Sequence, residues 1–570
     1  MMVGLSGPAA SALSISVVYS FTNVDGSEPI AALTPGPDGF LYGTTHTGGA
    51  FGYGTVFKIS TNGNLTTLHS FDWTNGAMPY GGVTLGPDGN FYGTTANGGP
   101  YVYDYSGLGT LYRISPTGAW TNLFFFDYTN GGCPTANLTL GPDGYLYGTT
   151  TDYGDFVYGQ ALGNGTIFRV NTNGSLTTVY DFVHSGSYQN QMTNDVFPWS
   201  SLTLGPDGNF YGTAEGAHAY DSTSYSSMYY GSVYVFGTNS GFSQLHHFDF
   251  TNNGANPFAG LTVGSDGCLY GTTANGGQYA FTNSSVYGGT VFKITTNGII
   301  TNLVTFDYTN GATPYGALTP APDGNLYGTT SQGGASGHGT LFEIDTNGTM
   351  TALFSFGGTN GSAPFTGLTL GPDGNYYGTT YSGGANLSGE IYRLGFPPAI
   401  PSTNQPPDTT NIIGSFVFAS VRATGSAPLA YQWYFNGNPL AGATSSVLTE
   451  SPFLPGEAGQ YQVVVTNAFG SVTSRLATLG ITIQPNPYAI SNLGGGNLEI
   501  FLASFPLSAN LLWATTNLSA GPWWIVSTNI TDITGLAQQP VTNNGSAGAI
   551  FYRLQNVLGI GIRGPGTGSD

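Results

Sequence analysis

Short apolar runs alternate with tight-turn residues along most of the chain. A phrase of the form LTLGPDGNxYGTT occurs seven times, beginning at Leu33, Val83, Leu138, Leu202, Leu261, Leu318 and Leu368. A GTVFKI-like phrase follows each copy, and six of the seven units continue with an LTTLHSF-like phrase. Pro-Asp-Gly and Thr-Asn-Gly separate these runs, and both favour tight hairpins. Each unit is therefore predicted to contain four short strands, named a, b, c and d in chain order.

The units recur at intervals of 50 to 64 residues, which is typical of four-stranded β-propeller blades. The seventh unit ends after its c run at Leu394 and has no d run, whereas SVVYSF at 16–21 is a d run with no unit before it. We expect this first strand to complete the last blade, because a closed array hides its sheet edges. The prediction is an all-β protein with a seven-bladed propeller at 16–396.

Composition supports short strands and excludes several classes of function. The chain has 90 Gly and 33 Pro, its aromatic content is 14%, and its formal net charge is −20. Such a charge argues against nucleic-acid binding, which requires Lys and Arg to neutralise phosphates. No run of 18 apolar residues predicts a membrane span. Cys133 and Cys268 are expected to be free thiols. Residues 1–15 are interpreted as a signal-peptide remnant or a disordered segment.

The repeated phrase GPDGNxYGTT, followed by GTVFKIxTNG and LTTLxxFDxTNGA, resembles the GloVer tandem repeat, which is named for Gloeobacter and Verrucomicrobia. The resemblance covers residues 16–394. It implies a secreted or cell-surface bacterial protein, but no settled activity.

The remaining residues predict further β-domains. A Pro-rich linker is expected at 397–408. Residues 409–483 resemble a bacterial immunoglobulin-like β-sandwich, which implies that Trp433 is the core tryptophan and Tyr461 the tyrosine corner. Val421 and Val463 replace its usual cysteines. A small C-terminal β-sandwich is expected at 486–556, followed by a flexible tail at 557–570.

Propeller topology places the b–c loops and the d–a connections on one face and the short turns on the other. The b–c loops of blades 2 to 5 are long and rich in tyrosine, which suits sugar stacking or protein contact. Mutual packing of these loops is the alternative. The candidate binding residues in them are Tyr101, Tyr103, Tyr105, Tyr153, Tyr158, Tyr220, Tyr229, Tyr230, Tyr279 and Tyr287.

A proline precedes every a strand, and the residue after it is mostly aromatic. These residues are Ile30, Tyr80, Thr135, Trp199, Phe258, Tyr315 and Phe365. We expect them to wedge between neighbouring blades as core. In the alternative interpretation they form a binding rim at the channel mouth, and Tyr80, Trp199 and Tyr315 are then candidate binding residues.

Blade 4 departs from the pattern, because YGTAEGAHAYD replaces YGTTxxGG. Glu215, His218 and Asp221 are therefore candidates for an acid/base pair or a metal site, although loop residues of these types are usually solvated. No HExxH, GxSxG or Walker motif is present. We expect no cofactor and no metal. The acidity is compatible with calcium, but the chain has no Asp-x-Asp-x-Asp-Gly loop.

The predicted function is non-catalytic recognition or adhesion outside the cell by a monomer that binds a glycan or an extracellular protein. An enzyme that acts on polysaccharide or lactone, as a lyase or hydrolase with Glu215 and His218 over the central channel, is one alternative. A structural surface-layer component is another.

Overall fold

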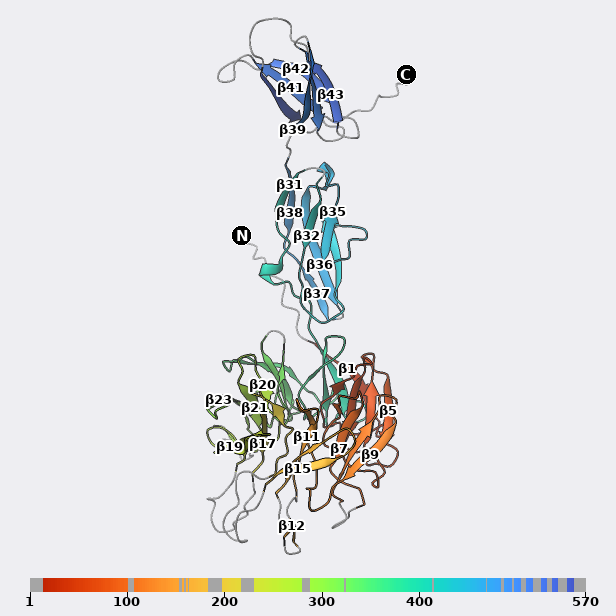
Figure 1. Cartoon of the computed structure of the whole chain (residues 1–570), viewed down its shortest axis with the longest axis vertical. Coiled ribbons are helices and arrows are strands. Elements are labelled where there is room, and N and C mark those ends of the chain that lie inside the picture. The colour runs from red at the N-terminus through yellow and green to blue at the C-terminus, as the bar shows by residue number, and fades with distance from the viewer. Residues whose placement is uncertain are drawn as a thin grey trace. The chain divides into compact units, whose positions relative to one another are not determined.

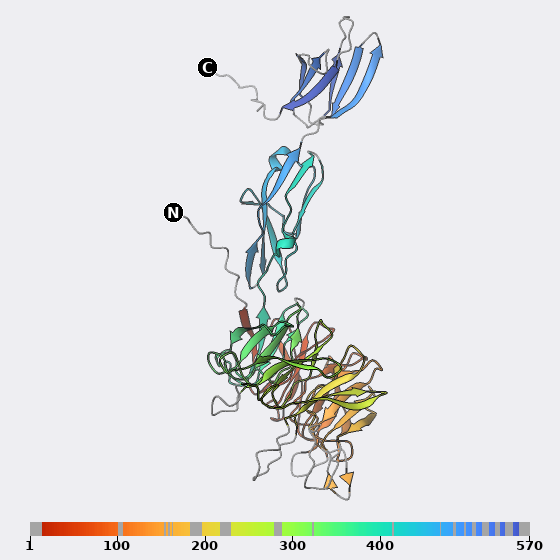
Figure 2. The same ribbon diagram turned by 90° about the vertical axis from the view of Figure 1, so that its left-hand side faces the viewer.

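The computed structural model describes residues 14–570 apart from 101–106, 153–155, 158–159, 162–163, 183–196, 217–229, 279–287, 322–323, 413–414, 468, 483–485, 495–496, 504–508, 516–523, 531–535, 542–550 and 558–570. From residue 482 onward only backbone strands are described. Strands dominate this part of the chain (Figures 1 and 2), and its helices are two single 3₁₀ turns, Ser402–Asn404 and Pro455–Glu457. No helix within it is long and apolar enough to cross a membrane.

The chain divides between Phe396 and Pro397 into two compact units. The first, Ala12–Phe396, is called the repeat domain below. It contains seven four-stranded antiparallel sheets, numbered 1 to 7 along the chain. The strands of sheets 1 to 3 are β2 (Thr34–Pro35), β3 (Leu41–Thr45), β4 (Thr55–Ile59) and β5 (Leu65–Ser70); β6 (Thr84–Leu85), β7 (Phe91–Thr95), β8 (Thr110–Ile114) and β9 (Trp120–Phe125); β10 (Thr139–Leu140), β11 (Leu146–Thr150), β14 (Thr166–Val170) and β15 (Leu176–Asp181). A small separate hairpin, β12 (Phe156–Val157) and β13 (Gln160–Ala161), lies between β11 and β14 in the chain.

Sheets 4 to 6 repeat the same order of strands. They comprise β16 (Thr203–Leu204), β17 (Phe210–Ala214), β18 (Ser232–Gly237) and β19 (Gly241–His247); β20 (Thr262–Val263), β21 (Leu269–Thr273), β22 (Thr290–Ile294) and β23 (Ile300–Thr305); β24 (Thr319–Pro320), β25 (Leu326–Thr330), β26 (Thr340–Ile344) and β27 (Met350–Ser355).

Sheet 7 contains both ends of the repeat domain. Its strands are β28 (Thr369–Leu370), β29 (Tyr376–Thr380), β30 (Glu390–Gly395) and the first strand of the chain, β1 (Ser14–Ser20). β1 pairs antiparallel with β30, from Ser14 opposite Gly395 to Ser20 opposite Glu390; Figure 1 labels β1. The predicted pairing of the first strand with the last sheet is confirmed.

Hydrogen bonds join the seven sheets in a closed cycle. The threonine that begins the a strand of each sheet donates from its hydroxyl to the backbone carbonyl of the residue before the a strand of another sheet. Six bonds run from sheet n to sheet n + 1: Thr34 to Val83, Thr84 to Leu138, Thr139 to Leu202, Thr203 to Leu261, Thr262 to Leu318 and Thr319 to Leu368. The seventh returns from Thr369 Oγ1 to the Leu33 carbonyl at 2.7 Å.

The apolar core follows the same cycle, because one hydrophobic cluster fills each junction between neighbouring sheets. At the junction of sheets 1 and 2, Tyr42 stacks on Phe91 with ring centroids 3.9 Å apart. At the junction of sheets 7 and 1, Tyr377 and Ile391 share a cluster with Phe21 and Leu33. Burial of these side chains is the main favourable contribution to folding.

The repeated sequence phrase encodes this scaffold. In six sheets the phrase's tyrosine donates to the aspartate of its own Pro-Asp-Gly or Ser-Asp-Gly turn, as Tyr42 OH does to Asp38 Oδ2 at 2.7 Å. The glycine of YGTT lies under the c-strand aromatic ring, and a Cβ on Gly43 would come within 2.6 Å of Phe57. The second threonine meets the first c-strand residue, as Thr45 Oγ1 does with Thr55 Oγ1 at 2.8 Å.

The second unit contains two sets of sheets. β31 (Thr409–Ile412), β38 (Ala477–Thr482), β36 (Gly459–Asn467), β33 (Ala430–Phe435), β34 (Asn438–Pro439) and β37 (Gly470–Thr473) form one sheet, and β32 (Val417–Ser420) pairs with β35 (Val447–Glu450). β39 (Asn486–Gly494), β40 (Asn497–Ala503) and β43 (Leu536–Val541) form a three-stranded sheet, as do β42 (Trp524–Ile530), β41 (Ala509–Thr515) and β44 (Phe551–Val557).

Trp433 is the centre of the core that the first set encloses. Its side chain is fully buried, and its indole N–H donates to the Ser445 carbonyl at 2.9 Å. Val421 and Val463 belong to the same core cluster. The Tyr461 hydroxyl donates to the Glu457 carbonyl at 2.7 Å, four residues upstream.

Candidate functional site

Each connection that enters an a strand contains a left-handed residue directly before its proline. None of these residues is glycine, and their φ angles lie between 51° and 60°: Glu28, Met78, Cys133, Phe197, Asn256, Thr313 and Ala363. Such a conformation costs on the order of 1–3 kcal/mol and persists only where surrounding structure enforces it.

Two backbone hydrogen bonds enforce it here. The Met78 N–H donates to the Tyr53 carbonyl at 2.9 Å, and the Met78 carbonyl accepts from the Ala96 N–H at 3.3 Å. The other six connections repeat this pair of bonds. Each connection is therefore held by two hydrogen bonds, one to a residue that precedes a c strand and one to a residue that follows a b strand. The residue after the proline is fixed in direction as a result.

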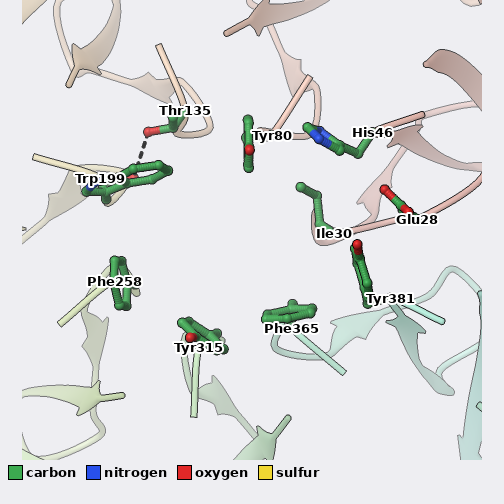
Figure 3. Close-up of a pocket in the computed structure, with 10 residues that line it drawn as sticks. All are labelled: Glu28, Ile30, His46, Tyr80, Thr135, Trp199, Phe258, Tyr315, Phe365 and Tyr381. Carbon is green, nitrogen blue, oxygen red and sulfur yellow. Dashed lines mark hydrogen bonds between the residues drawn. The ribbon is translucent and has the colours of Figure 1, made fainter. Parts of the chain in front are cut away.

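The seven residues that follow the prolines surround one cavity of about 440 Å³, called the central pocket below (Figure 3). Its lining consists of Ile30, Tyr80, Thr135, Trp199, Phe258, Tyr315 and Phe365, together with Glu28, His46 and Tyr381. The volume lies in the range of about 300–1,000 Å³ that is usual for small-molecule sites. Each of the seven connections therefore contributes at least one side chain to this cavity, and the connection that enters sheet 1 contributes two, Glu28 and Ile30.

Aromatic rings follow one another around most of the wall. Ring centroids are 4.4 Å apart for His46 and Tyr80, 6.0 Å for Tyr80 and Trp199, and 6.1 Å for Trp199 and Phe258. The series continues at 5.3 Å to Tyr315, 4.8 Å to Phe365 and 5.2 Å to Tyr381. Thr135 lies between Tyr80 and Trp199, where its hydroxyl donates to the Trp199 carbonyl at 3.4 Å (Figure 3).

The polar part of the wall lies where the first and last sheets meet. Glu28 lies in the connection before sheet 1, His46 follows the b strand of sheet 1 and Tyr381 follows that of sheet 7, and Figure 3 shows them on one side of the pocket. Burial lowers the pKa of His46, although the nearby Glu28 charge acts in the opposite direction. The lowered pKa favours the neutral imidazole at neutral pH. Burial and the Glu28 carboxylate raise the pKa of Tyr381. This wall therefore combines one acidic side chain with neutral hydrogen-bonding groups.

The structure brings three of the predicted binding residues together, namely Tyr80, Trp199 and Tyr315. The expectation that the seven residues after proline are buried between blades is wrong, because all seven line the cavity, and only Thr135, at 7% exposure, is buried there. The others are partly exposed, and Tyr80 reaches 37%. They are partly exposed because the clamped connections direct them toward the cavity and not into the inter-sheet clusters.

The predicted loop tyrosines are placed in part. Tyr230 lies outside the central pocket, packs against the cluster between sheets 4 and 5, and has its ring centroid 5.2 Å from that of Phe250. Outside the described residues lie Tyr101, Tyr103, Tyr105, Tyr153, Tyr158, Tyr220, Tyr229, Tyr279 and Tyr287.

Of the three candidate catalytic residues, only Glu215 lies among the described residues; His218 and Asp221 do not. Glu215 is half-buried directly after the b strand of sheet 4, at the position that His46 and Tyr381 occupy in sheets 1 and 7. Burial, with a smaller contribution from the Glu215 charge, raises the pKa of Tyr315. The Glu215 carboxylate therefore lies close enough to the pocket wall to influence one of its rings.

Sequence reasoning missed Glu28, His46 and Tyr381. A signal for the last two exists in the sequence, because the residue after YGTT or YGTA is the first position where the repeats diverge: His46, Ala96, Thr151, Glu215, Ala274, Ser331 and Tyr381. The described residues contain no group of three or more His, Cys, Asp or Glu side chains that could hold a metal ion. Cys133 and Cys268 form no disulfide, as expected.

Comparison with known proteins gives one extended match. The sequence profile of the Gloeobacter/Verrucomicrobia repeat matches residues 8–162 and 161–392. No curated protein matches the chain. Similar solved structures include titin M4 in its trigonal form (27% identity, 16% of this chain and 99% of that chain, TM-score 0.14) and the titin Ig tandem domains A164-A165 (16% identity, 26% and 96%, TM-score 0.16).

Proposed function

This chain belongs to the Gloeobacter/Verrucomicrobia repeat family, and we propose that it is a non-catalytic recognition protein that acts outside the cell. In this proposal the repeat domain is a seven-bladed β-propeller, and residues 409–483 and 486–556 are β-sandwich spacers, the first of them immunoglobulin-like. The central pocket is the binding site, and its ligand is a terminal group of a glycan or of an extracellular protein.

One observation carries the proposal: seven equivalent connections from seven sheets all contribute a side chain to one cavity. A cavity lined mainly by rings with a few polar groups is the usual form of a small-ligand site. The strained, doubly hydrogen-bonded residue before each proline holds these rings in place before a ligand arrives. Such preorganisation reduces the entropic cost of binding.

The closed cycle of sheets also supports recognition at this position. Both the hydrogen bonds and the apolar clusters run through all seven junctions, so the rings stand on a scaffold that resists deformation. Rigid aromatic side chains with polar tips suit sugar and protein contacts, because they bury much area at little loss of conformational freedom.

A screen of the full-length chain tests the proposal. The protein is applied to a glycan array and to extracellular protein fractions, with product analysis on every hit. Trp199→Ala and Phe258→Ala each remove a pocket ring, whereas Phe51→Ala removes an aromatic ring that is 60% exposed in a b–c connection and does not line the pocket. Loss of binding in both pocket variants with retention in Phe51→Ala is the expected result.

Retained binding in both pocket variants would contradict the central pocket as the site. The combined variant Tyr103→Ala, Tyr158→Ala, Tyr229→Ala and Tyr287→Ala then reports whether the tyrosine-rich loops bind instead.

An enzyme is the second candidate, favoured by one specific observation. Glu28, His46 and Tyr381 place a carboxylate, an imidazole and a phenol on the same side of one pocket, and groups of these types serve as general acids and bases. Turnover of any glycan or lactone that is abolished by His46→Gln and Glu28→Gln would establish catalysis and overturn the recognition proposal.

A further inference from the structure

We propose that the group received by the central pocket is an organic ammonium cation, either a methylated ammonium or the protonated amine of an amino sugar. This inference rests on the proposed function, because it names the ligand of the same site. Three independent features carry it: the aromatic wall, the acidic groups beside that wall, and the distribution of positive charge over the repeat domain.

The aromatic wall provides favourable electrostatics for a cation. Five rings succeed one another from Trp199 to Tyr381 at centroid separations of 4.8 to 6.1 Å, and Figure 3 shows them around an open centre. The face of an aromatic ring carries negative charge density, so a cation in the cavity is attracted by each ring that presents its face to it. Partly desolvated sites of this kind are the usual receptors for alkylated ammonium groups.

The acidic groups strengthen this preference. Among the ten lining residues, Glu28 is the only acidic one, and none is lysine or arginine. The lowered pKa of His46 favours its neutral form. Glu28 acts electrostatically on Tyr80 and Tyr381, and Glu215 on Tyr315. The two carboxylates therefore influence rings on different sides of the cavity. An anion bound in the pocket would face the Glu28 carboxylate and no lysine or arginine among the lining residues.

Positive charge is confined to the other end of the sheets. The repeat domain contains five Lys and Arg residues, and all lie at the same position of a c strand: Lys58, Arg113, Arg169, Lys293 and Arg393. Lys58, Arg169 and Lys293 form ion pairs with the turn aspartates Asp38, Asp143 and Asp266. These turns lead into the b strands, whereas His46, Glu215 and Tyr381 follow the b strands.

The sequence segments between b and c strands contain no lysine or arginine. Among the described residues of these segments, Glu215 adds a second carboxylate directly after a b strand. An excess of negative charge raises the local concentration of cations and accelerates their association. The pocket end of the repeat domain therefore favours a cation before any contact with the rings is made.

Two pairs of ligands test the inference, each with one charged and one neutral member. Calorimetric titration of the full chain compares choline with 3,3-dimethylbutanol, in which carbon replaces the charged nitrogen. It also compares a glucosamine tetramer with the neutral N-acetylglucosamine tetramer. The variants are Glu28→Gln, which removes charge at constant size, and Phe258→Leu, which removes a ring. Glu343→Gln is the control, because Glu343 lies on the c strand β26 at the end away from the pocket, where its carboxylate accepts a hydrogen bond from the Asn325 side chain.

The expected result is binding of the charged member of at least one pair about tenfold more tightly than its neutral partner, corresponding to ~1.4 kcal/mol. Glu28→Gln and Phe258→Leu each weaken that binding, Glu343→Gln does not, and added salt reduces the affinity. The pair that responds identifies the source, either a methylated ammonium or an amino sugar.

Three outcomes would overturn the inference. Equal or tighter binding of the neutral members would exclude a cation while leaving the pocket as a recognition site. If Glu28→Gln and Phe258→Leu leave cation binding unchanged, the cation binds outside the pocket, through the general negative charge of the surface. Absence of binding by all four ligands would also contradict the inference, and the proposed function would then be decided by its own screen of glycans and proteins.

Discussion

The Thr369 hydroxyl donates a 2.7 Å hydrogen bond to the carbonyl of Leu33, 336 residues earlier in the chain. Thr369 begins the last sheet of the repeat domain and Leu33 precedes the first strand of sheet 1. The bond is equivalent to the six that join successive sheets. The relationship makes the array cyclic, and the central pocket depends on this closure because Glu28 and Tyr381 approach each other from opposite ends of the repeats.

Closure predicts that the bond between the last and first sheets is as strong as one within the array. Thr369→Val and Thr139→Val each remove one donor and leave the accepting carbonyl in place. Each is expected to lower the free energy of unfolding by about 1 kcal/mol. Denaturant titration of the full chain measures both. A cost for Thr139→Val with none for Thr369→Val would indicate that the array is open.

Glu390 predicts a pH-dependent stability of the sheet that closes the cycle. It occupies the position of Thr55 in sheet 1, is 1% exposed, and accepts from the Ser20 hydroxyl at 2.8 Å, while its Oε2 has no hydrogen-bond partner among the described residues. Burial raises the pKa of Glu390. The unfolded chain therefore loses this proton at lower pH than the folded protein does, so the contribution of Glu390 to stability is largest below the unfolded pKa and is lost as pH rises through the folded pKa.

The variant Glu390→Gln removes this ionisation. Relative to wild type, it is expected to gain about 1 kcal/mol of stability at pH 8 and little or nothing at pH 4. Denaturation at a series of pH values checks the difference. A stability difference that is the same at pH 4 and pH 8 would show that Glu390 does not titrate in this range.

The repeated tyrosine–aspartate pairs predict instability in alkali. Burial and the bond to the turn aspartate raise the pKa of Tyr92 and of Tyr270 to about 12. Because these values exceed the ordinary value of 10.0, the contribution of each pair is complete below pH 10 and is lost as the pH approaches 12. Ultraviolet titration of tyrosine ionisation, followed together with circular dichroism, should show the late-ionising class appear as the sheets unfold. Late ionisation in a protein that stays folded would contradict this coupling.

The glycine of the YGTT phrase predicts a non-additive pair of substitutions. A Cβ at Gly43 would lie 2.6 Å from Phe57 and 2.7 Å from Leu33. Gly43→Ala is expected to destabilise the protein by about 1–3 kcal/mol through overpacking. Phe57→Leu makes room for that methyl group, so the double variant should cost less than the sum of the single variants. Strict additivity would show that the two positions do not interact.

Much of the scaffold could be predicted from the sequence because its determinants are local and repeated seven times. Pro-Asp-Gly and Thr-Asn-Gly mark the hairpins, and the unmatched run at 16–21 predicts the pairing of β1 with β30 that the structure contains. The repeat pattern did not indicate which residues line the pocket. Glu28, Met78 and Thr313 carry no feature that announces a left-handed conformation, because hydrogen bonds from distant segments impose it.

The direction of the residues after proline could not be predicted for the same reason. Aromatic residues such as Trp199 and Phe258 fit a core and a pocket wall equally well by composition, and only the clamped connection determines which they form. The approach of Tyr381 to Glu28 depends on cyclic closure and has no local signal at all.

Recognition in the central pocket is tested most directly by a crystal structure of the full chain with the tightest binder from the screens. Ligand density is expected inside the central pocket, in contact with Trp199, Phe258 and Tyr315 and with its polar group toward Glu28. Ligand density on the tyrosine-rich loops or on the second unit, with an empty central pocket, would contradict it.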